Sequence, residues 1–339
     1  MTDPYLAVCL QPLIRQAHNR TNVKENFERI SKLIHATAFL RKRWPHGWVQ
    51  GDVKLVAFPE YCFSDWRGIA LGDIDPMDVA IEIPGDEVEP LVSASVEENV
   101  YVAAQALEID KRFPGHFFNA AFIISPSGKI IYKRHKLRHL LLTLYTSPND
   151  ILDEYVKVFG RGKTIGQTVF PVVETPIGKL GMCVCHEVAT PEVARQLAAN
   201  GAEVVIRSTN EPETGWVYLD RARALENVMF WVVGNSGPSE YQTSASDYGH
   251  SRIIGFRGEI LGESGGAGET AAGGLIDLDA LRKVKEPGLP PYSTAVFDYH
   301  QIPSIPANMF LKGRLSRKEI EETYVRLGLY SHLATKEIL

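Results

Sequence analysis

The sequence predicts a layered α/β fold, on two observations. Short apolar runs of strand length alternate with longer stretches whose apolar residues recur every three or four positions. Turns with Gly or Pro separate these segments, and there is no Ser/Gly-rich linker, low-complexity tract or convincing repeat. Alternating strand and helix signals are typical of helices packed on the faces of a sheet.

We expect one domain over residues 1–284 and an extension over residues 285–339. The extension is rich in proline and irregular at Lys285–Asn308, and charged and helical at Leu311–Glu337. Because it lacks the regular alternation of the rest of the chain, we expect it to pack on a neighbouring subunit.

The first five elements follow from periodicity and from residues that end an element. Val23, Phe27, Ile30 and Ile34 have the spacing of one helix face. Pro59 stops an apolar run, because proline has no backbone N–H to offer a sheet. We therefore expect strands at Tyr5–Gln11, Val53–Phe58 and Val100–Leu107. We expect helices at Asn22–Trp44 and Asp86–Glu98, the second with Asp86 as its possible N-cap.

Three hairpins are expected in the rest of the chain, each with a glycine in its turn. Their strand pairs are Phe118–Ser125 with Lys129–Lys133, Val172–Thr175 with Lys179–Val184, and Arg252–Phe256 with Glu259–Gly262. Between the last two hairpins we expect helices at Ala189–Asn200 and Tyr218–Met229, and strands at Ala202–Arg207 and Phe230–Asn235.

The composition excludes several classes of protein. With 36 Lys and Arg against 41 Asp and Glu, the net charge is −5, whereas nucleic-acid binders usually carry a basic excess. No apolar stretch reaches the ~18 residues of a membrane helix, so we expect neither nucleic-acid nor membrane partners. The 4 cysteines do not form a disulfide-scaffold pattern, and the N-terminus lacks the regions of a signal peptide. We therefore expect a cytoplasmic protein.

Two charged residues that follow predicted strands are candidates for catalysis. Glu60, directly after Pro59, is held by rigid backbone at the end of an apolar strand and suits a general base. Lys136 lies in the basic run Tyr132–His139, where a single lysine turned inward can stabilise an oxyanion. Lys133, in the same run, is the alternative.

The third candidate is Cys185, which lies where an apolar strand gives way to a turn. Backbone N–H groups at such a turn can bind a developing negative charge. The run Cys183-Val184-Cys185-His186 lacks the spacing of a zinc site. A strand would also place Cys183 and Cys185 on one face and His186 on the other, so we expect no metal there.

Together these residues predict attack of a thiolate on an amide-like carbon. Cys185 attacks, and Glu60 takes the thiol proton and later transfers it to the departing amine. Lys136 and the backbone N–H of His186 stabilise the oxyanion. Water activated by Glu60 then hydrolyses the thioester.

From Leu6 to about Leu281 the chain resembles the nitrilase, or carbon–nitrogen hydrolase, superfamily. Phe58–Glu60 resembles its first catalytic motif, Lys136-Leu137 its lysine motif, and Val184–Glu187 its nucleophile motif. Further stretches agree in order, namely Thr190–Glu203, Arg221–Asn227 with Asn235, and Gly249–Leu261.

The resemblance implies a four-layer α-β-β-α sandwich that forms homo-oligomers, dimers or larger. It also implies hydrolysis of an amide or nitrile by Cys185, Glu60 and Lys136, with water and without metal or cofactor. The spacing of 76 residues between Glu60 and Lys136 resembles the amidase branches. A small amide, cleaved to a carboxylic acid and ammonia, is therefore the expected substrate. The alternatives are a nitrilase, an N-carbamoyl amide hydrolase, and an inactive family member that acts as a binding protein.

The second acid that the family has shortly after its lysine is absent from the usual place. Glu154 is the candidate for that role, and Asp153 is its rival. His186 stands where the family commonly has an aromatic residue. The residues that we expect around the oxyanion and the pocket are His186, Tyr61, Asn210 and Glu211.

Overall fold

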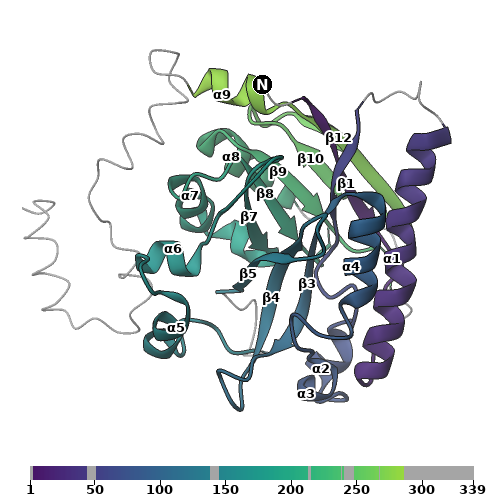
Figure 1. The fold of residues 1–339 in the computed structure, drawn as a ribbon, viewed down its shortest axis with the longest axis vertical. Helices are drawn as coiled ribbons and strands as arrows, with labels where there is room; N and C mark the ends of the chain where they lie inside the picture. Colours follow the sequence, from purple (N-terminus) through teal and green to yellow (C-terminus); the bar gives the residue numbers. More distant parts are fainter. Residues whose placement is uncertain are drawn as a thin grey trace, which may run out of the picture.

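The computed structural model describes residues 3–43, 51–137, 145–212, 215–237, 239, 248–266 and 268–285. These residues form four layers, with two sheets packed face to face and helices on the outer face of each (Figure 1). The expected α-β-β-α sandwich is therefore confirmed. Apart from Lys285, the expected extension, with its helix at Leu311–Glu337, lies outside the described residues.

The first sheet has the strand order β12-β1-β2-β3-β4-β5. Strands β1, β2 and β3 are parallel, β4 is antiparallel to β3, and β5 is antiparallel to β4. The carboxyl ends of β2 and β5 therefore lie at the same edge of the sheet. Its strands are β1 (Tyr5–Gln11), β2 (Val53–Ala57), β3 (Tyr101–Ile109), β4 (Phe117–Ile124), β5 (Ile130–His135) and β12 (Thr270–Ile276).

The second sheet has the strand order β11-β10-β9-β8-β7-β6. Strands β7, β8 and β9 are parallel, so the residues that follow them lie at one edge. Its strands are β6 (Val173–Thr175), β7 (Gly178–Val184), β8 (Val204–Ser208), β9 (Phe230–Gly234), β10 (Arg252–Ile254) and β11 (Ile260–Glu263).

Helices cover the outer face of each sheet (Figure 1). The first sheet carries α1 (Arg20–Arg43) and α4 (Glu89–Glu98), and the second carries α7 (Pro191–Ala199) and α8 (Trp216–Asn227). The other described helical segments are α2 (Arg67–Leu71), α3 (Pro76–Val79), α5 (Leu152–Phe159), α6 (Ile165–Val169), the 3-10 turn η1 (Cys185–Ala189) and α9 (Leu278–Val284). None of the helices in the described ranges is long and apolar enough to span a bilayer.

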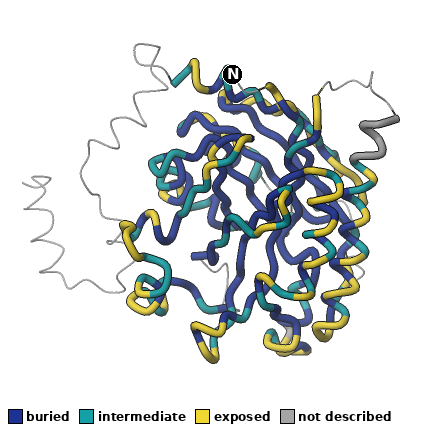
Figure 2. The backbone as a smooth tube through the Cα atoms, in the orientation of Figure 1, coloured by how far each residue is buried: buried dark blue, intermediate teal, exposed yellow. Residues whose placement is uncertain are grey.

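Three apolar layers hold the sandwich together. The layer between α1, α4 and the first sheet includes Phe27 and Phe63, whose ring centres lie 3.8 Å apart. The layer between the sheets includes Leu55 and Met182, and the layer under α7 and α8 includes Trp231. Most strands are accordingly buried on both faces, except the edge strands β6, β11 and β12, and exposed residues gather on the outer helices and loops (Figure 2). Burial on both faces explains why the strands read as continuous apolar runs.

The two sheets approach each other closely where β2 ends. Ser208 Oγ donates a hydrogen bond of 2.8 Å to the Phe58 carbonyl, and the Glu60 N–H donates one of 3.2 Å to the Thr209 carbonyl. A Cβ atom on Gly234 would lie 3.0 Å from the Phe58 carbonyl carbon. The absence of a side chain at Gly234 therefore lets β9 approach the segment that carries Glu60.

The structure corrects two details of the sequence-based elements. The helix expected at Asp86–Glu98 begins at Glu89, and Val88 rather than Asp86 occupies its N-cap. The residues before it form a turn in which the Val88 N–H donates to the Gly85 carbonyl at 3.1 Å. Strand β12 was not predicted, because its two adjacent glycines weaken the strand signal and its partner β1 lies at the other end of the domain.

We predict that Gly234→Ala destabilises the protein by about 1–3 kcal/mol, the usual effect of overpacking a filled site. The added methyl group would press on the backbone at Phe58, which cannot move without parting the sheets. Urea denaturation followed by circular dichroism measures the change. Gly273→Ala in β12 is the control, because a Cβ atom there meets only the Ala7 carbonyl at 4.0 Å. Equal stability of the two variants would contradict the close approach.

Candidate active site

Glu60 is buried at the end of β2 and is held by a chain of polar side chains. Its Oε1 accepts hydrogen bonds of 2.8 Å from both Lys136 Nζ and Asn119 Nδ2. Gln105 Nε2 donates to Asn119 Oδ1 at 2.9 Å, which turns the Asn119 amide so that its N–H groups face Glu60. Gln105 Oε1 in turn accepts from the Tyr61 N–H at 2.6 Å. The carboxylate therefore has a fixed position and orientation.

Lys136 directly follows β5 and is the lysine that reaches Glu60. Its backbone N–H donates to the Asn119 carbonyl at 2.8 Å, which extends the pairing of β5 with β4 by one residue. Its ammonium lies 5.6 Å from the centre of the Tyr145 ring. The side chain is 4 % exposed, so the ammonium acts in an environment where its charge is weakly screened.

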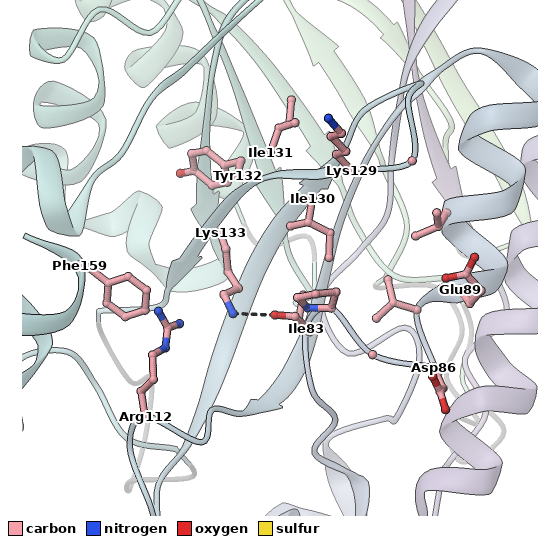
Figure 3. A pocket seen from close by; sticks show the side chains of 15 residues that line it. Ile83, Asp86, Glu89, Arg112, Lys129, Ile130, Ile131, Tyr132, Lys133 and Phe159 are labelled. Carbon is pink, nitrogen blue, oxygen red and sulfur yellow. Dashed lines mark hydrogen bonds between the residues drawn. The ribbon is translucent and has the colours of Figure 1, made fainter.

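Lys133 faces a different part of the molecule. Its Nζ donates to the Ile83 carbonyl at 2.7 Å and forms an ion pair with Glu108. These contacts lie at a pocket of about 850 Å³ beside β5, between Arg112 and the turn at Asp86 (Figure 3). None of the three predicted catalytic residues lines this pocket. Lys136 rather than Lys133 is therefore the lysine at the Glu60 carboxylate.

Cys185 is the first residue after β7 and has a left-handed backbone, with φ of 50°. Non-glycine residues seldom adopt this conformation, and those that do are enriched at active sites. It also overturns the expectation that Cys183 and Cys185 share one face. Cys183 packs in the layer under α7 and α8, whereas Cys185 lies in the layer between the sheets. Within the described ranges, no group of three or more His, Cys, Asp or Glu side chains could hold a metal ion.

Glu187 joins the segment of the lysine to the segment of the thiol. Its carboxylate and the Arg134 guanidinium are both fully buried and form two parallel hydrogen bonds of 2.7 and 2.9 Å. The same carboxylate accepts from the backbone N–H groups of Leu137 at 2.7 Å and Val184 at 2.8 Å. These two N–H groups belong to the residues next to Lys136 and Cys185 in the chain. One carboxylate therefore fixes both segments by their backbones.

The thiol of Cys185 has a raised pKa. Burial is the main cause and the negative charge of Glu60 adds to it, while the positive charges of Lys136 and Arg207 oppose it. Burial by itself would lower the pKa of Lys136, but the negative charge of the Glu60 carboxylate raises it well above its usual value. At neutral pH the resting site therefore holds a protonated thiol and a charged ammonium.

Three of the expected pocket residues lie next to the catalytic candidates. The Tyr61 hydroxyl accepts from Asn119 Nδ2 at 3.3 Å, and Asn210 Nδ2 donates to the Glu60 carbonyl at 3.5 Å. His186 follows the nucleophile, and its ring packs edge-on against Trp216 with centres 5.4 Å apart. This aromatic contact shows how an imidazole fills a position where the family commonly has an aromatic ring.

The acid that contacts the thiol is Glu211, which follows β8. Cys185 Sγ donates to Glu211 Oε2 at 3.8 Å. The candidate second acid, Glu154, is exposed on α5, as is its rival Asp153. In the described part of the chain, no hydrogen bond or ion pair joins either of them to the thiol or to Glu60. The structure therefore brings Glu60, the lysine, the thiol and Glu211 together, and leaves Glu154 apart.

Sequence reasoning missed the residues that support the site. Gln105 and Asn119 are fully buried polar residues inside the apolar strands β3 and β4. An amide in such a run is a usable signal, because a buried polar group requires a hydrogen-bond partner. Arg134 was missed because it lies in the basic run Tyr132–His139, and such runs are typical of a solvated surface.

The sequence profile of the carbon-nitrogen hydrolase family matches residues 13–286, which is well over half of the chain. The chain belongs to the carbon–nitrogen hydrolase family. It is thus a member of the nitrilase superfamily and a hydrolase of carbon–nitrogen bonds other than peptide bonds, as the motifs implied.

Curated relatives of this carbon–nitrogen hydrolase include amide-cleaving enzymes. It is 26% identical over 267 residues to the omega-amidase NIT2 of Xenopus tropicalis, covering 77% of this chain and 86% of the relative. It is 28% identical over 264 residues to the formamidase of Bacillus cereus (strain Q1), covering 76% and 69%.

Solved structures share the fold. Nit3 of Saccharomyces cerevisiae, described as a member of branch 10 of the nitrilase superfamily, aligns with a TM-score of 0.62 and 20% identity, over 83% of this chain and 93% of that one. An amidase from Nesterenkonia sp. aligns with a TM-score of 0.58 and 18% identity, over 82% and 92%.

We predict that Glu187→Ala greatly destabilises this carbon–nitrogen hydrolase. The variant leaves the Arg134 charge buried without its carboxylate, a change that usually costs ~3–5 kcal/mol. Glu82→Ala is the control, because the side chain of Glu82 is exposed and pairs with that of the exposed Lys111 at 2.9 Å. Such pairs contribute about 0–1 kcal/mol. Guanidinium denaturation measures both, and an equally small loss in the two variants would contradict the role of Glu187.

Proposed function

We propose that this enzyme hydrolyses a small amide to a carboxylic acid and ammonia, with Cys185 as nucleophile, Glu60 as general base and acid, and Lys136 as the cation beside the oxyanion. The proposal rests on one observation. Glu60 and Lys136 are in contact at 2.8 Å, and the charges of both act on the buried Cys185 thiol. The names of the curated relatives, an omega-amidase and a formamidase, favour an amide over a nitrile.

Acylation begins when Glu60 takes the proton from Cys185 Sγ. The sulfur bonds to the amide carbon, and the electron pair of the C=O bond moves onto the oxygen, where the Lys136 ammonium stabilises it. When the carbonyl re-forms, the C–N bond breaks and Glu60 gives its proton to the nitrogen. Ammonia leaves, and a thioester remains on Cys185.

Deacylation repeats these steps with water. Glu60 takes a proton from the water, and the resulting hydroxide attacks the thioester carbon. The C–S bond then breaks, the carboxylic acid leaves, and the proton on Glu60 returns to the sulfur. Because the pKa of the Cys185 thiol is raised, the thiol is protonated in the resting enzyme and needs Glu60 as its base.

We further propose that the enzyme works in the cytoplasm as a homo-oligomer. All four cysteines are free thiols, as a reducing compartment preserves them. The oligomer, with the extension at 285–339 at its subunit contacts, follows from the family resemblance. Sedimentation of the full chain and of a chain ending at residue 284 tests it.

We predict that ammonia is released from small primary amides and that Cys185→Ala abolishes the release. Glu60→Gln and Lys136→Met should each lower kcat/KM by at least ~10²-fold, since each removes a proton-transfer or oxyanion group. The panel contains amides, nitriles and N-carbamoyl amino acids, with Glu192→Gln, an exposed acid on α7, as the control. Turnover of nitriles or carbamoyl compounds alone would assign the enzyme to those branches. A lack of any turnover would favour a binding protein.

We also predict a pH dependence for the rate at which iodoacetamide alkylates Cys185. This rate should still rise with pH in the range where the alkylation rate of ordinary thiols, with pKa of about 8.5, no longer changes. A raised pKa means that the reactive thiolate is scarcer than for an ordinary thiol at each pH below it. Mass spectrometry of the Cys185 peptide measures the rate, and the same peptide in unfolded protein is the reference. A plateau already reached at pH 7 would indicate a preformed thiolate and contradict this view of the resting site.

A further inference from the structure

Glu211 contacts the nucleophile from the second sheet. Its Oε2 lies 3.8 Å from Cys185 Sγ, and its side chain is only 8 % exposed. Asn235, after β9, fixes its backbone from both sides. The Glu211 N–H donates to Asn235 Oδ1 at 3.2 Å, and Asn235 Nδ2 donates to the Glu211 carbonyl at 2.9 Å. Asn235 therefore fixes the backbone position from which the Glu211 carboxylate reaches the sulfur.

The two carboxylate oxygens of Glu211 have different partners. Oε1 forms an ion pair with Arg207, which is fully buried. Arg207 also donates to the Cys185 carbonyl at 3.0 Å and to both oxygens of Asp220 at 3.1 and 3.2 Å. Arg207 thus links the backbone of the nucleophile to the carboxylate. Oε2 is the oxygen turned toward the reacting sulfur.

The thiol stops donating to Oε2 as soon as the reaction begins. In the proposed mechanism the sulfur proton moves to Glu60, and the sulfur then carries the substrate carbon. A buried acceptor that loses its donor costs about 1–3 kcal/mol, and more when it is charged. The substituents of the new tetrahedral carbon are the groups closest to the sulfur. An N–H on that carbon can replace the thiol as the donor, whereas the oxygen of an ester cannot.

We propose that Glu211 Oε2 accepts a hydrogen bond from the substrate nitrogen, in the tetrahedral intermediate and as ammonia departs, so that Glu211 is a catalytic residue that selects primary amides over esters. This inference rests on the function proposed above. Glu211 itself exchanges no proton. The proton passes from Cys185 to Glu60 and then to the nitrogen, the C–N bond breaks, and ammonia leaves while hydrogen-bonded to Oε2.

Glu60 and Glu211 therefore have different roles: Glu60 transfers the proton, and Glu211 accepts a hydrogen bond. Glu60 Oε1 already accepts from Lys136 and Asn119, and Glu60 has to carry the proton. Glu211, paired at Oε1 with the Arg207 guanidinium, offers a fixed acceptor at Oε2. A site built to hydrogen-bond a substrate N–H strongly disfavours an analogue without it, because the site's own polar group is then left unpaired.

The test compares a primary amide with the methyl ester of the same acid in full-length wild type, Glu211→Gln and Glu211→Asp. Both variants should lower kcat/KM for the amide by ~10²-fold, the usual effect of losing one transition-state hydrogen bond. The ester rate should change by less than ~3-fold, because no donor faces Glu211 in that reaction. Glu192→Gln, on the exposed side of α7, is the matched control and should leave both rates unchanged. Glu211→Asp keeps a carboxylate beside Arg207, so it provides the test if Glu211→Gln folds poorly.

The outcomes separate this inference from the proposed function. A fall in the amide-to-ester ratio, with the unfolding midpoint retained, supports the role of Glu211. Equal losses on amide and ester in both variants overturn it and leave the amidase function standing. Wild-type enzyme that cleaves the ester but no amide overturns the proposed function, and the inference with it.

Discussion

The buried pair of Arg134 and Glu187 is the interaction on which the active site depends. Removing two charges from water costs several kcal/mol per ion, and only good geometry with further hydrogen bonds compensates for it. Here two parallel bonds and two backbone N–H groups satisfy the carboxylate. The arginine lies on β5 of the first sheet, and the glutamate follows β7 of the second. A shift of one sheet against the other would leave a charge buried and unpaired, so the pair fixes the relative position of the two sheets where the chemistry takes place.

The proposed chemistry needs this constraint because the two sheets contribute different groups to the site. The first sheet supplies the Glu60 carboxylate and the Lys136 ammonium, and the second supplies the Cys185 thiol and Glu211. All four follow strands whose carboxyl ends meet, where open α/β sheets commonly bind ligands. Charges of opposite sign are paired before any substrate arrives, so little reorganisation accompanies the reaction. The tight contact at Gly234 serves the same end, since it holds the backbone before Glu60 against β9.

The sequence predicted the fold, and it singled out the candidate catalytic residues for a local reason. Glu60 and Cys185 each follow an apolar run that ends abruptly, a feature visible in a few neighbouring residues, and Lys136 lies in a short basic run at the end of a strand. What escaped prediction depends on contacts between distant segments. Glu211 was expected at the pocket, but its contact with the sulfur arises only because β8 lies beside β7. Glu154, the candidate second acid, lies exposed on α5. The supporting Gln105 and Asn119 pair across β3 and β4, and only the fold brings them to Glu60.

At Cys185 the left-handed backbone favours glycine for stability, whereas the proposed chemistry requires a thiol. A side chain in that conformation costs about 1–2 kcal/mol, which glycine avoids. Most random change is neutral or destabilising, and stabilising replacements are easy to find wherever function does not forbid them. A chain under selection for stability alone would drift toward glycine at this position. The thiol of Cys185 stands where the backbone favours glycine, which is what selection for the reactivity proposed for this residue would leave in the chain.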